Sequence, residues 1–420
     1  MTLLIVSPDY ASHLLPLATL GTAWRDRGER VVVATGPATA AIVESFGFER
    51  VNLQLGKGSN PGVIRAEEQP EGEDDALRGF FDATRQGPIE TLEYQARERL
   101  SDLMWEPVRQ ARAVQAIVER VRPDAVIVDH LAFSARVGLV AGRIRHADVV
   151  LGHPSALPVA GELYGYPPEW PTTMAPDAAE LADLRQLCQR VSESFTREWN
   201  DALLELEPAA TPASSAFAEY GDLLLFNYPE RLAVPGRVTA PHAYLGSAAR
   251  DELIDSDVEE WLASGDGPFV YVSFGSFLSV RDDVLARVAR ALEALGVRAA
   301  IALGSGDRTV LGAVPNDWLV REFLPQVTLL KRAAASVTHG GNNSVTEAET
   351  FGVPMLVLPF STDQFAGAAA IERTGVGRVL PPNTATVDDL RFALEAVLRL
   401  PHSPLPGLAG REIAYAALTS

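Results

Sequence analysis

Short apolar runs alternate with longer segments of helical periodicity along the whole chain. The runs are mostly aliphatic, and each is followed by a glycine, a proline or a polar residue. Uninterrupted runs of this kind are expected of strands buried on both faces of a parallel sheet, and their alternation with helices predicts β-α-β units. We expect strands at residues 3–6, 31–34, 125–128, 149–151 and 222–226 in the first half, and at 269–274, 298–303, 335–338 and 355–358 in the second.

The length of 420 residues suggests two domains of this doubly wound α/β type. Prolines and a glycine interrupt the pattern after residue 228, so we expect a first domain at 1–228 and a linker at 229–249. A second domain is expected at 250–405. The last segment, 406–420, is helical in pattern, and we expect it to pack back on the first domain.

Charge and cysteine content exclude several classes of protein. The chain has 36 Lys and Arg against 55 Asp and Glu, a net charge of -19, which argues against a partner that is nucleic acid or an anionic membrane. A single cysteine, Cys188, leaves no internal disulfide and no cysteine-rich zinc site. The first apolar run is too short for a signal sequence, and no window approaches the roughly 20 apolar residues of a membrane span. We therefore expect a cytoplasmic protein without stable membrane insertion.

The strongest local signal follows the run at 335–338. Residues 338–347 read Thr-His-Gly-Gly-Asn-Asn-Ser-Val-Thr-Glu, so a buried strand ends, two glycines turn the chain and a helix begins near Asn342. Main-chain N–H groups and the positive end of the helix dipole would face an anion there, with Asn343 and Ser344 as further donors. The stretch predicts a diphosphate cradle, while an ordinary helix start with Asn and Ser caps is the alternative.

A candidate base and its partner follow two strands of the first half. His13 lies in the loop after the first strand, and Asp129 ends the run at 125–128, so both are expected at the carboxyl edge of the sheet, where ligands bind in such folds. A neutral imidazole accepts a proton near physiological pH, and a carboxylate fixes its tautomer. Asp9 and His130 lie close by as competing candidates, and a structural role for each remains the alternative.

The stretch from Phe323 to Gln364 resembles the nucleotide-sugar signature of family 1 glycosyltransferases, in an ordered match of several points. The chain is most similar to the bacterial members that glycosylate antibiotics and other natural products. This resemblance implies the GT-B fold, in which two doubly wound, Rossmann-like domains face each other across a cleft. It also implies that residues 1–228 bind the acceptor and residues 250–405 bind the nucleotide-sugar.

The resemblance assigns roles to single residues. It implies that His13 is the general base and Asp129 its partner, although Ser12 stands where the family usually has glycine. It implies base stacking for Phe323, a nucleoside contact for Gln326 and a ribose contact for Glu347. The remaining donor residues it implies are phosphate contacts at Ser276, His339, Gly341, Asn343 and Ser344, and sugar-hydroxyl contacts at Asp363 and Gln364.

The acceptor is expected to be small and largely apolar. The loop at 157–176 carries prolines and aromatic residues, and it either lines the cleft or packs on the surface by its own side chains. Residues that would line an acceptor pocket, or belong to the core instead, are Phe80, Phe81, Tyr94, Trp105, Tyr164, Tyr166 and Trp170.

The sequence therefore predicts an inverting glycosyltransferase that moves a sugar from a TDP or UDP donor to a small-molecule acceptor. No cofactor and no metal are expected, because Asp255 and Asp257, spaced like a metal-diphosphate motif, precede an apolar helix pattern and are typical of a helix cap. A homodimer is possible. The alternatives are a non-catalytic auxiliary protein and a GT-B nucleotide-sugar epimerase, whereas a dinucleotide oxidoreductase is disfavoured because no G-x-G-x-x-G links a strand to a helix.

Overall fold

A computed structural model describes residues 1–62, 73–99, 103–159, 161–249, 252–265, 267–405 and 409–419. The side chains at 73–74, 98–99 and 276–277 also lie outside this description. The predicted loop at 56–72 and the expected boundaries at 250 and 406 fall partly or wholly outside the described residues.

The first half of the chain forms a parallel sheet, which has seven strands in the described residues in the order β3-β2-β1-β4-β5-β6-β7. Ile5 of the central strand lies opposite Val33 on one side and Ile127 on the other, so the predicted apolar runs form its buried middle. The strands are β1 (Thr2–Val6), β2 (Arg30–Thr35), β3 (Glu49–Asn52), β4 (Ala125–Asp129), β5 (Ala147–Val150), β6 (Leu223–Phe226) and β7 (His242–Tyr244).

The second half repeats this arrangement in another parallel sheet, with six described strands in the order β10-β9-β8-β11-β12-β13. Val337 lies opposite Val272 and Leu356 in its centre. The two doubly wound α/β domains predicted from the sequence are confirmed. The strands are β8 (Phe269–Ser273), β9 (Arg298–Ala302), β10 (Leu319–Arg321), β11 (Ala335–Thr338), β12 (Met355–Val357) and β13 (Gly377–Val379).

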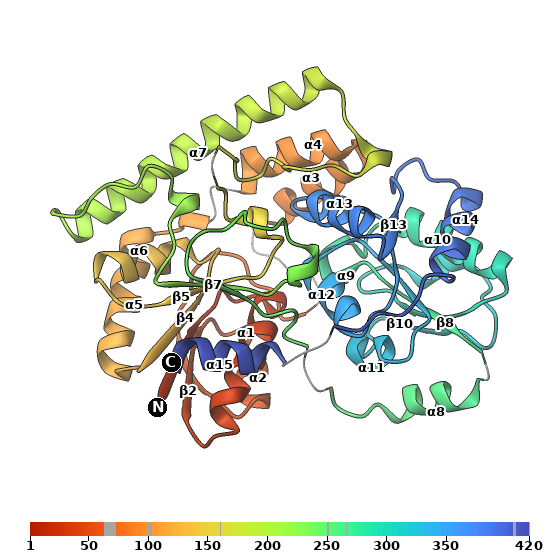
Figure 1. Ribbon diagram of the computed structural model, residues 1–420, viewed down its shortest axis with the longest axis horizontal. Helices are drawn as coiled ribbons and strands as arrows, with labels where there is room; N and C mark the ends of the chain where they lie inside the picture. Colours follow the sequence, from red (N-terminus) through yellow and green to blue (C-terminus); the bar gives the residue numbers. More distant parts are fainter. Residues whose placement is uncertain are drawn as a thin grey trace.

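Helices flank both sheets, and the longest, α7, runs along the top of the molecule in Figure 1. Its start follows from the local sequence, because Asp177 caps the helix and Glu180 completes a capping box. In the first half the helices are α1 (Ala11–Arg25), α2 (Ala40–Ser45), α3 (Glu73–Gln86), α4 (Pro88–Tyr94), α5 (Pro107–Val121), α6 (Phe133–Ala141) and α7 (Ala178–Leu206). In the second half they are α8 (Ser256–Ser264), α9 (Gly275–Leu278), α10 (Asp282–Leu295), α11 (Gln326–Leu330), α12 (Asn342–Thr350), α13 (Gln364–Thr374), α14 (Val387–Val397) and α15 (Gly410–Thr419).

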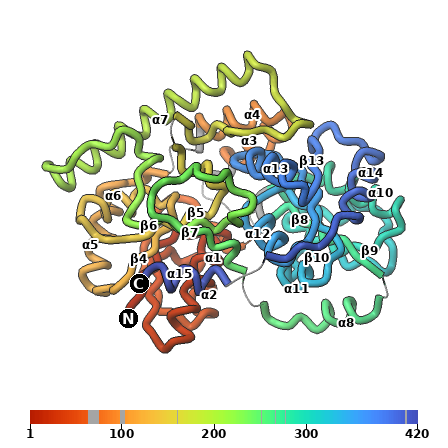
Figure 2. The backbone as a smooth tube through the Cα atoms, viewed as in Figure 1, coloured from red at the N-terminus to blue at the C-terminus, as the bar shows by residue number. Residues whose placement is uncertain are grey.

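The chain passes from one domain to the other more than once. The expected linker at 229–249 contains β7, which pairs with β6, so the first sheet extends beyond residue 228. At the other end, α15 returns to the first domain and lies beside α1, near both chain termini (Figures 1 and 2). Tyr415 packs edge-on against Trp24 with ring centroids 4.9 Å apart, and Arg27 donates to Glu412 at 2.6 Å.

The helix α3 belongs to the first half of the sequence but packs against the second domain. Phe80 and Phe81 are buried in the hydrophobic core formed by β8, β9, α10 and α14. Arg281 of the second domain, itself buried, donates from Nη1 to the carbonyl of Thr84 at 3.0 Å. The interpretation of Phe80 and Phe81 as acceptor-lining residues is therefore wrong, because the core of the donor-side domain excludes both rings from the cleft.

The acidic pair before α8 has the structural role that the apolar pattern predicts. The Asp255 carboxylate accepts hydrogen bonds from the main-chain N–H groups of Asp257 and Val258, both at 3.1 Å, and so caps the helix. Both carboxylates also bind Arg321, at 2.9 Å for Asp255 and 2.5 Å for Asp257. The Asp255 carboxylate is therefore engaged in capping α8, and both carboxylates are engaged in ion pairs with Arg321.

Within the described ranges, no helix is both long and apolar enough to cross a bilayer.

Candidate active site

The carboxyl edges of the two sheets face each other, and the starts of α1 and α12 meet between them. The Asn343 side chain donates from Nδ2 to the carbonyl of Ser12 at 2.9 Å. Its neighbour Asn342 donates from Nδ2 to the carbonyl of Asn227, also at 2.9 Å. The residue that precedes His13 is thus hydrogen-bonded to the helix start that carries the predicted diphosphate cradle.

His13 and Asp129 form a hydrogen-bonded pair on the first-domain side. Nδ1 of His13 lies 2.6 Å from Oδ2 of Asp129, and Oδ1 of Asp129 accepts from the main-chain N–H of Leu131 at 2.8 Å. The carboxylate is buried, while the imidazole keeps 26% of its surface exposed. Burial by itself would raise the pKa of Asp129, but His13 and the Leu131 amide outweigh it and lower that pKa below its usual value. The carboxylate is therefore charged and fixes the imidazole through its Nδ1.

Asp9, one of the two competing candidates, has other contacts. The Asp9 carboxylate accepts from the main-chain N–H groups of Ala38 and Thr39, at 3.0 and 2.9 Å, and from the Thr39 hydroxyl at 2.8 Å. A Cβ atom at Gly36 would come within 2.3 Å of the Asp9 carboxylate, so that glycine makes room for it. Asp9 therefore fastens the loop after β2 and is not the partner of His13.

His13 lies in the first turn of α1 and not in the loop before it, where the sequence placed it. The segment that leads into this turn is braced although it lacks glycine. The buried Asn60 donates its main-chain N–H to the carbonyl of Asp9 at 2.9 Å and accepts from the N–H of Ala11 at 2.7 Å. Together with the Asp9 contacts, these bonds fix the chain on both sides of Tyr10. The position of His13 is thus held by main-chain pairing, which the sequence did not indicate.

A buried ion pair supports the turn that carries Asp129. Arg136 pairs with Asp148, and both side chains are at most 2% exposed. Arg136 also donates from Nη1 to the carbonyl of His130 at 2.9 Å. Since His130 directly follows Asp129, the guanidinium holds the main chain of this turn in place. His130 itself is buried, and its ring packs near Phe133.

On the second-domain side, β11 ends at Thr338 and two glycines turn the chain into α12. Gly340 has a φ of 85°, which favours glycine, and Gly341 is the N-cap residue with no side-chain hydrogen bond to the helix start. The alternative of an ordinary start capped by Asn or Ser is thus not what the structure has. A Cβ atom at Gly341 would lie 2.2 Å from Nε2 of His339, and one at Gly275 would lie 2.9 Å from its Cε1. Two glycines therefore leave the space in which the imidazole sits.

Three histidines in this region are expected to couple stability to pH. Burial lowers the pKa of His339 and of His130 to about 4 and that of His153 to about 3. The unfolded chain, with imidazole pKa values near 6.5, binds more protons than the folded one between these values, so stability is lost as the pH falls from about 6.5 to about 4. Each histidine contributes up to about 1.4 kcal/mol per pH unit in this window.

Denaturant unfolding at a series of pH values between 7 and 4.5 measures this slope. His130→Phe, which keeps a ring beside Phe133, should flatten the profile, whereas His402→Gln at an exposed position should not. A free energy of unfolding that stays level over the whole range would contradict the prediction.

A polar network joins the predicted nucleoside residues. Gln326 donates from Nε2 to Oε2 of Glu347 at 2.6 Å, and its Oε1 accepts from the Tyr271 hydroxyl at 3.3 Å and from the Ser344 hydroxyl at 3.5 Å. The Glu347 side chain is 5% exposed. The structure thus brings together Gln326, Ser344 and Glu347, and adds Tyr271, which sequence reasoning missed because it lies inside an apolar strand.

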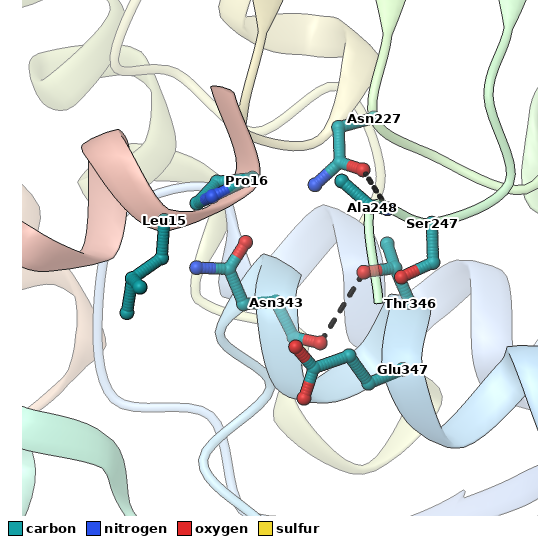
Figure 3. A pocket seen from close by; sticks show the side chains of 8 residues that line it. All are labelled: Leu15, Pro16, Asn227, Ser247, Ala248, Asn343, Thr346 and Glu347. Carbon is teal, nitrogen blue, oxygen red and sulfur yellow. Dashed lines mark hydrogen bonds between the residues drawn. The ribbon is translucent and has the colours of Figure 1, made fainter. Parts of the chain in front are cut away.

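A small polar cavity lies where the two domains meet beside α12 (Figure 3). In that view the Asn343 side chain points from α12 toward Leu15 and Pro16 of α1, Glu347 lies further along α12, and Asn227 lies on the segment after β6. Asn227 directly follows β6, and Asp129 is the last residue of β4, so the place of Asn227 at a strand end was the signal that could have found it. The cavity is lined by Leu15, Pro16, Asn227, Ser247, Ala248, Asn343, Thr346 and Glu347.

The two residues predicted to bind sugar hydroxyls have different surroundings. Asp363 accepts from the main-chain N–H of His153 in the first domain, at 2.5 Å. Burial raises the pKa of this carboxyl group above its usual value. Gln364 is buried and accepts from the N–H groups of Phe360 and Ser361 at 3.0 and 3.2 Å, while its Nε2 lies 3.2 Å from the Ser361 hydroxyl. Gln364 therefore holds its own turn, and its contact with a sugar hydroxyl stays a prediction.

Phe323 lies in the loop between β10 and α11, at the carboxyl edge of the second sheet, and is 63% exposed. An exposed ring at this edge is available for stacking. Ser276 lies in α9, next to the glycine that faces His339, but its side chain is outside the described part of the structure.

The described part of the aromatic loop at 157–176 contacts α13 of the second domain and the turn at Ala216–Ala218 of the first. Trp170 stacks on Phe365 of α13 with ring centroids 4.8 Å apart, and Tyr164 stacks on Phe217 at 4.2 Å. Thr172 donates from its main-chain N–H and its hydroxyl to Glu372, at 2.8 and 2.7 Å. The loop thus bridges the two domains, and its expected role in lining an acceptor site stays a prediction.

Two domains of this topology, with facing carboxyl edges and a glycine turn at a helix start, define a class of group-transfer enzyme. The sequence profile of the family described as UDP-glucoronosyl and UDP-glucosyl transferase matches residues 186–403, just over half of the chain. The chain therefore belongs to this family and is a glycosyltransferase of the hexosyltransferase class.

Two curated relatives illustrate the similarity. The L-demethylnoviosyl transferase of Streptomyces niveus is 26% identical over 404 residues, which cover 94% of this chain and 89% of that protein. The uncharacterized UDP-glucosyltransferase YojK of Bacillus subtilis (strain 168) is 26% identical over 155 residues, and this match spans 35% of the chain and only 38% of that protein.

Solved structures show the same fold over the whole chain. CalG4, the calicheamicin glycosyltransferase, superimposes with a TM-score of 0.64 at 20% identity, covering 99% of this chain and 92% of that one. The glycosyltransferase VinC in complex with DTDP gives a TM-score of 0.63 at 19% identity, covering 100% and 94%. The fold is thus GT-B, as the resemblance implied.

Proposed function

We propose that the protein is an inverting glycosyltransferase that transfers a sugar from a thymidine or uridine diphosphate donor to a hydroxyl group of a small, largely apolar acceptor. One observation carries the proposal. The hydrogen bond between Asn343 and the Ser12 carbonyl joins the start of α12 to the first turn of α1, which carries His13, so a base and an anion cradle lie at one junction. DTDP bound to VinC, a protein of the same fold, supports a nucleoside diphosphate as the leaving group.

In this mechanism Nε2 of His13 removes the proton from the acceptor hydroxyl. The oxygen attacks the anomeric carbon, and the bond from that carbon to the diphosphate oxygen breaks on the opposite face, so the configuration inverts. Asp129 stabilises the imidazolium ion that forms. The proton ends on His13 and later passes to solvent or to the diphosphate.

The leaving diphosphate would be stabilised by the first turn of α12. The main-chain N–H groups that follow Gly341 and the positive end of the helix dipole offset its charge. His339 adds a neutral imidazole, because its pKa of about 4 keeps it uncharged at physiological pH. These groups supply charge stabilisation without a metal ion, so we propose that transfer continues in the presence of a chelator.

The test supplies TDP- and UDP-glucose with a panel of aromatic and macrocyclic alcohols and identifies the products by mass spectrometry and NMR. We expect a β-linked product from the α-linked donor, with release of one nucleoside diphosphate per glycoside. An α-linked product would contradict inversion. Conversion of the donor to an epimer without transfer would favour an epimerase, and nucleotide binding without any turnover would favour an auxiliary protein.

A further inference from the structure

The segment that leads into α8 carries two adjacent apolar side chains that are almost fully exposed. Leu253 is 94% exposed and Ile254 is 89% exposed. A single exposed apolar residue is ordinary on a protein surface, but a pair on a segment held at both ends keeps its apolar surface in one place. The pair therefore offers apolar surface for a ligand or a partner to cover.

Hydrogen bonds hold the segment beside the turn that carries Phe323. Oε2 of Glu252 accepts from the main-chain N–H of Thr328 at 2.8 Å, and Oδ2 of Asp255 accepts from Nη1 of Arg321 at 2.9 Å. Arg321 and Thr328 lie on either side of the turn, so residues 253–254 must run alongside it. Figure 1 shows this stretch entering α8 beneath α11.

The turn lies at the carboxyl edge of the second sheet, where the proposed function places the donor. Phe323, at 63% exposed, is the candidate for stacking on the nucleobase. The carboxylates of Glu252 and Asp255 already have partners, so the groups that this segment offers at its free side are two aliphatic side chains. Two exposed aliphatic side chains on a segment that runs along the turn of Phe323 offer apolar surface for the edge of a planar, partly apolar group.

We propose that Leu253 and Ile254 complete the nucleobase subsite and select thymine over uracil. This inference rests on the proposed function, and it specifies that the donor is a thymidine diphosphate sugar. Thymine carries a methyl group on C5 where uracil has hydrogen, and only an apolar surface gains free energy by covering that methyl group. A polar wall would treat the two bases alike.

The test compares thymidine diphosphate with 2′-deoxyuridine diphosphate, which differ only in this methyl group, by isothermal titration calorimetry of the full chain. The wild type should prefer thymidine diphosphate by about fourfold, the effect of covering one methyl-sized group. In the double variant Leu253→Ala with Ile254→Ala the preference should fall to about one, by the same arithmetic. Both side chains are exposed, so their truncation should leave the fold intact.

Two controls separate the possible failures. Phe392→Ala removes an exposed ring on α14 and should leave the preference unchanged, whereas Phe323→Ala should weaken both nucleotides equally. Equal affinities in the wild type, or a preference that survives the double variant, would overturn the inference while nucleotide binding still supports the proposed function. A change of oligomeric state in the double variant with an unchanged preference would overturn it in favour of a protein contact. If neither nucleotide binds the wild type, the proposed function fails first.

Discussion

His13→Ala should lower kcat for sugar transfer by about 10²–10⁴-fold, the usual contribution of a positioned general base. Donor binding should persist, because the donor-binding residues proposed here lie in the second domain and the imidazole contacts Asp129 instead. The measurement combines kcat with the dissociation constant of the nucleoside diphosphate. A variant that still transfers at the wild-type rate would remove His13 from the mechanism.

Two further variants make this test specific. Asp129→Asn keeps the size of the side chain but removes the charge that stabilises the imidazolium, so we expect a loss of about 10²-fold or more in kcat. His242→Ala, at an exposed position on β7, should leave transfer unchanged. If Asp129→Asn were as active as the wild type while His13→Ala was inactive, the pair would be an orienting contact without an electrostatic role.

Gly341→Ala should weaken binding of the nucleoside diphosphate by about 10²-fold, since a displacement of about 1 Å in a positioning element has this effect. The reason is local. A Cβ atom at this position would lie 2.2 Å from Nε2 and 2.7 Å from Cε1 of His339, so the ring must leave its place or the turn must open. Calorimetric titration with TDP or UDP measures the loss.

The matched control is Gly367→Ala in α13. A Cβ atom there has no neighbour within 4 Å, and alanine favours the helix, so binding should be unchanged and stability equal or slightly higher. Wild-type nucleotide affinity in Gly341→Ala would mean that the diphosphate does not bind at this turn.

The accuracy of the strand predictions depended on where each strand lies in its sheet. The runs at 3–6, 125–128 and 335–338 correspond to β1, β4 and β11, which are buried on both faces and therefore carry no charged residue inside the strand. The unpredicted strands are those at the sheet edges, β3, β7, β10 and β13. Edge strands are short and partly exposed, so Glu49 to Asn52 of β3 carry charged residues and no apolar run.

The features of the candidate site also differ in how well the sequence predicted them. The glycine turn before α12 and the place of His13 near the end of β1 could be predicted because each is a local pattern at the end of a buried strand, although His13 lies in the first turn of α1 and not in a loop. The contacts of Gln364 could not be predicted, because only the folded turn shows that its amide oxygen accepts from the main-chain N–H groups of Phe360 and Ser361. The place of Phe80 was also hidden, because an aromatic ring on an amphipathic helix suits a pocket or a core equally well.

The sequence by itself determined two doubly wound domains, the chemistry available at each strand end and a family signature in the second half. Each of these features depends on neighbouring residues or on a periodic pattern, so a continuous stretch of sequence is enough to recognise it. Only the tertiary structure decided that Asn343 meets Ser12, that Asp129 and not Asp9 holds His13, and that α3 packs into the second domain. Such contacts join residues far apart in the chain, and their energies depend on burial and distance, which no linear pattern specifies.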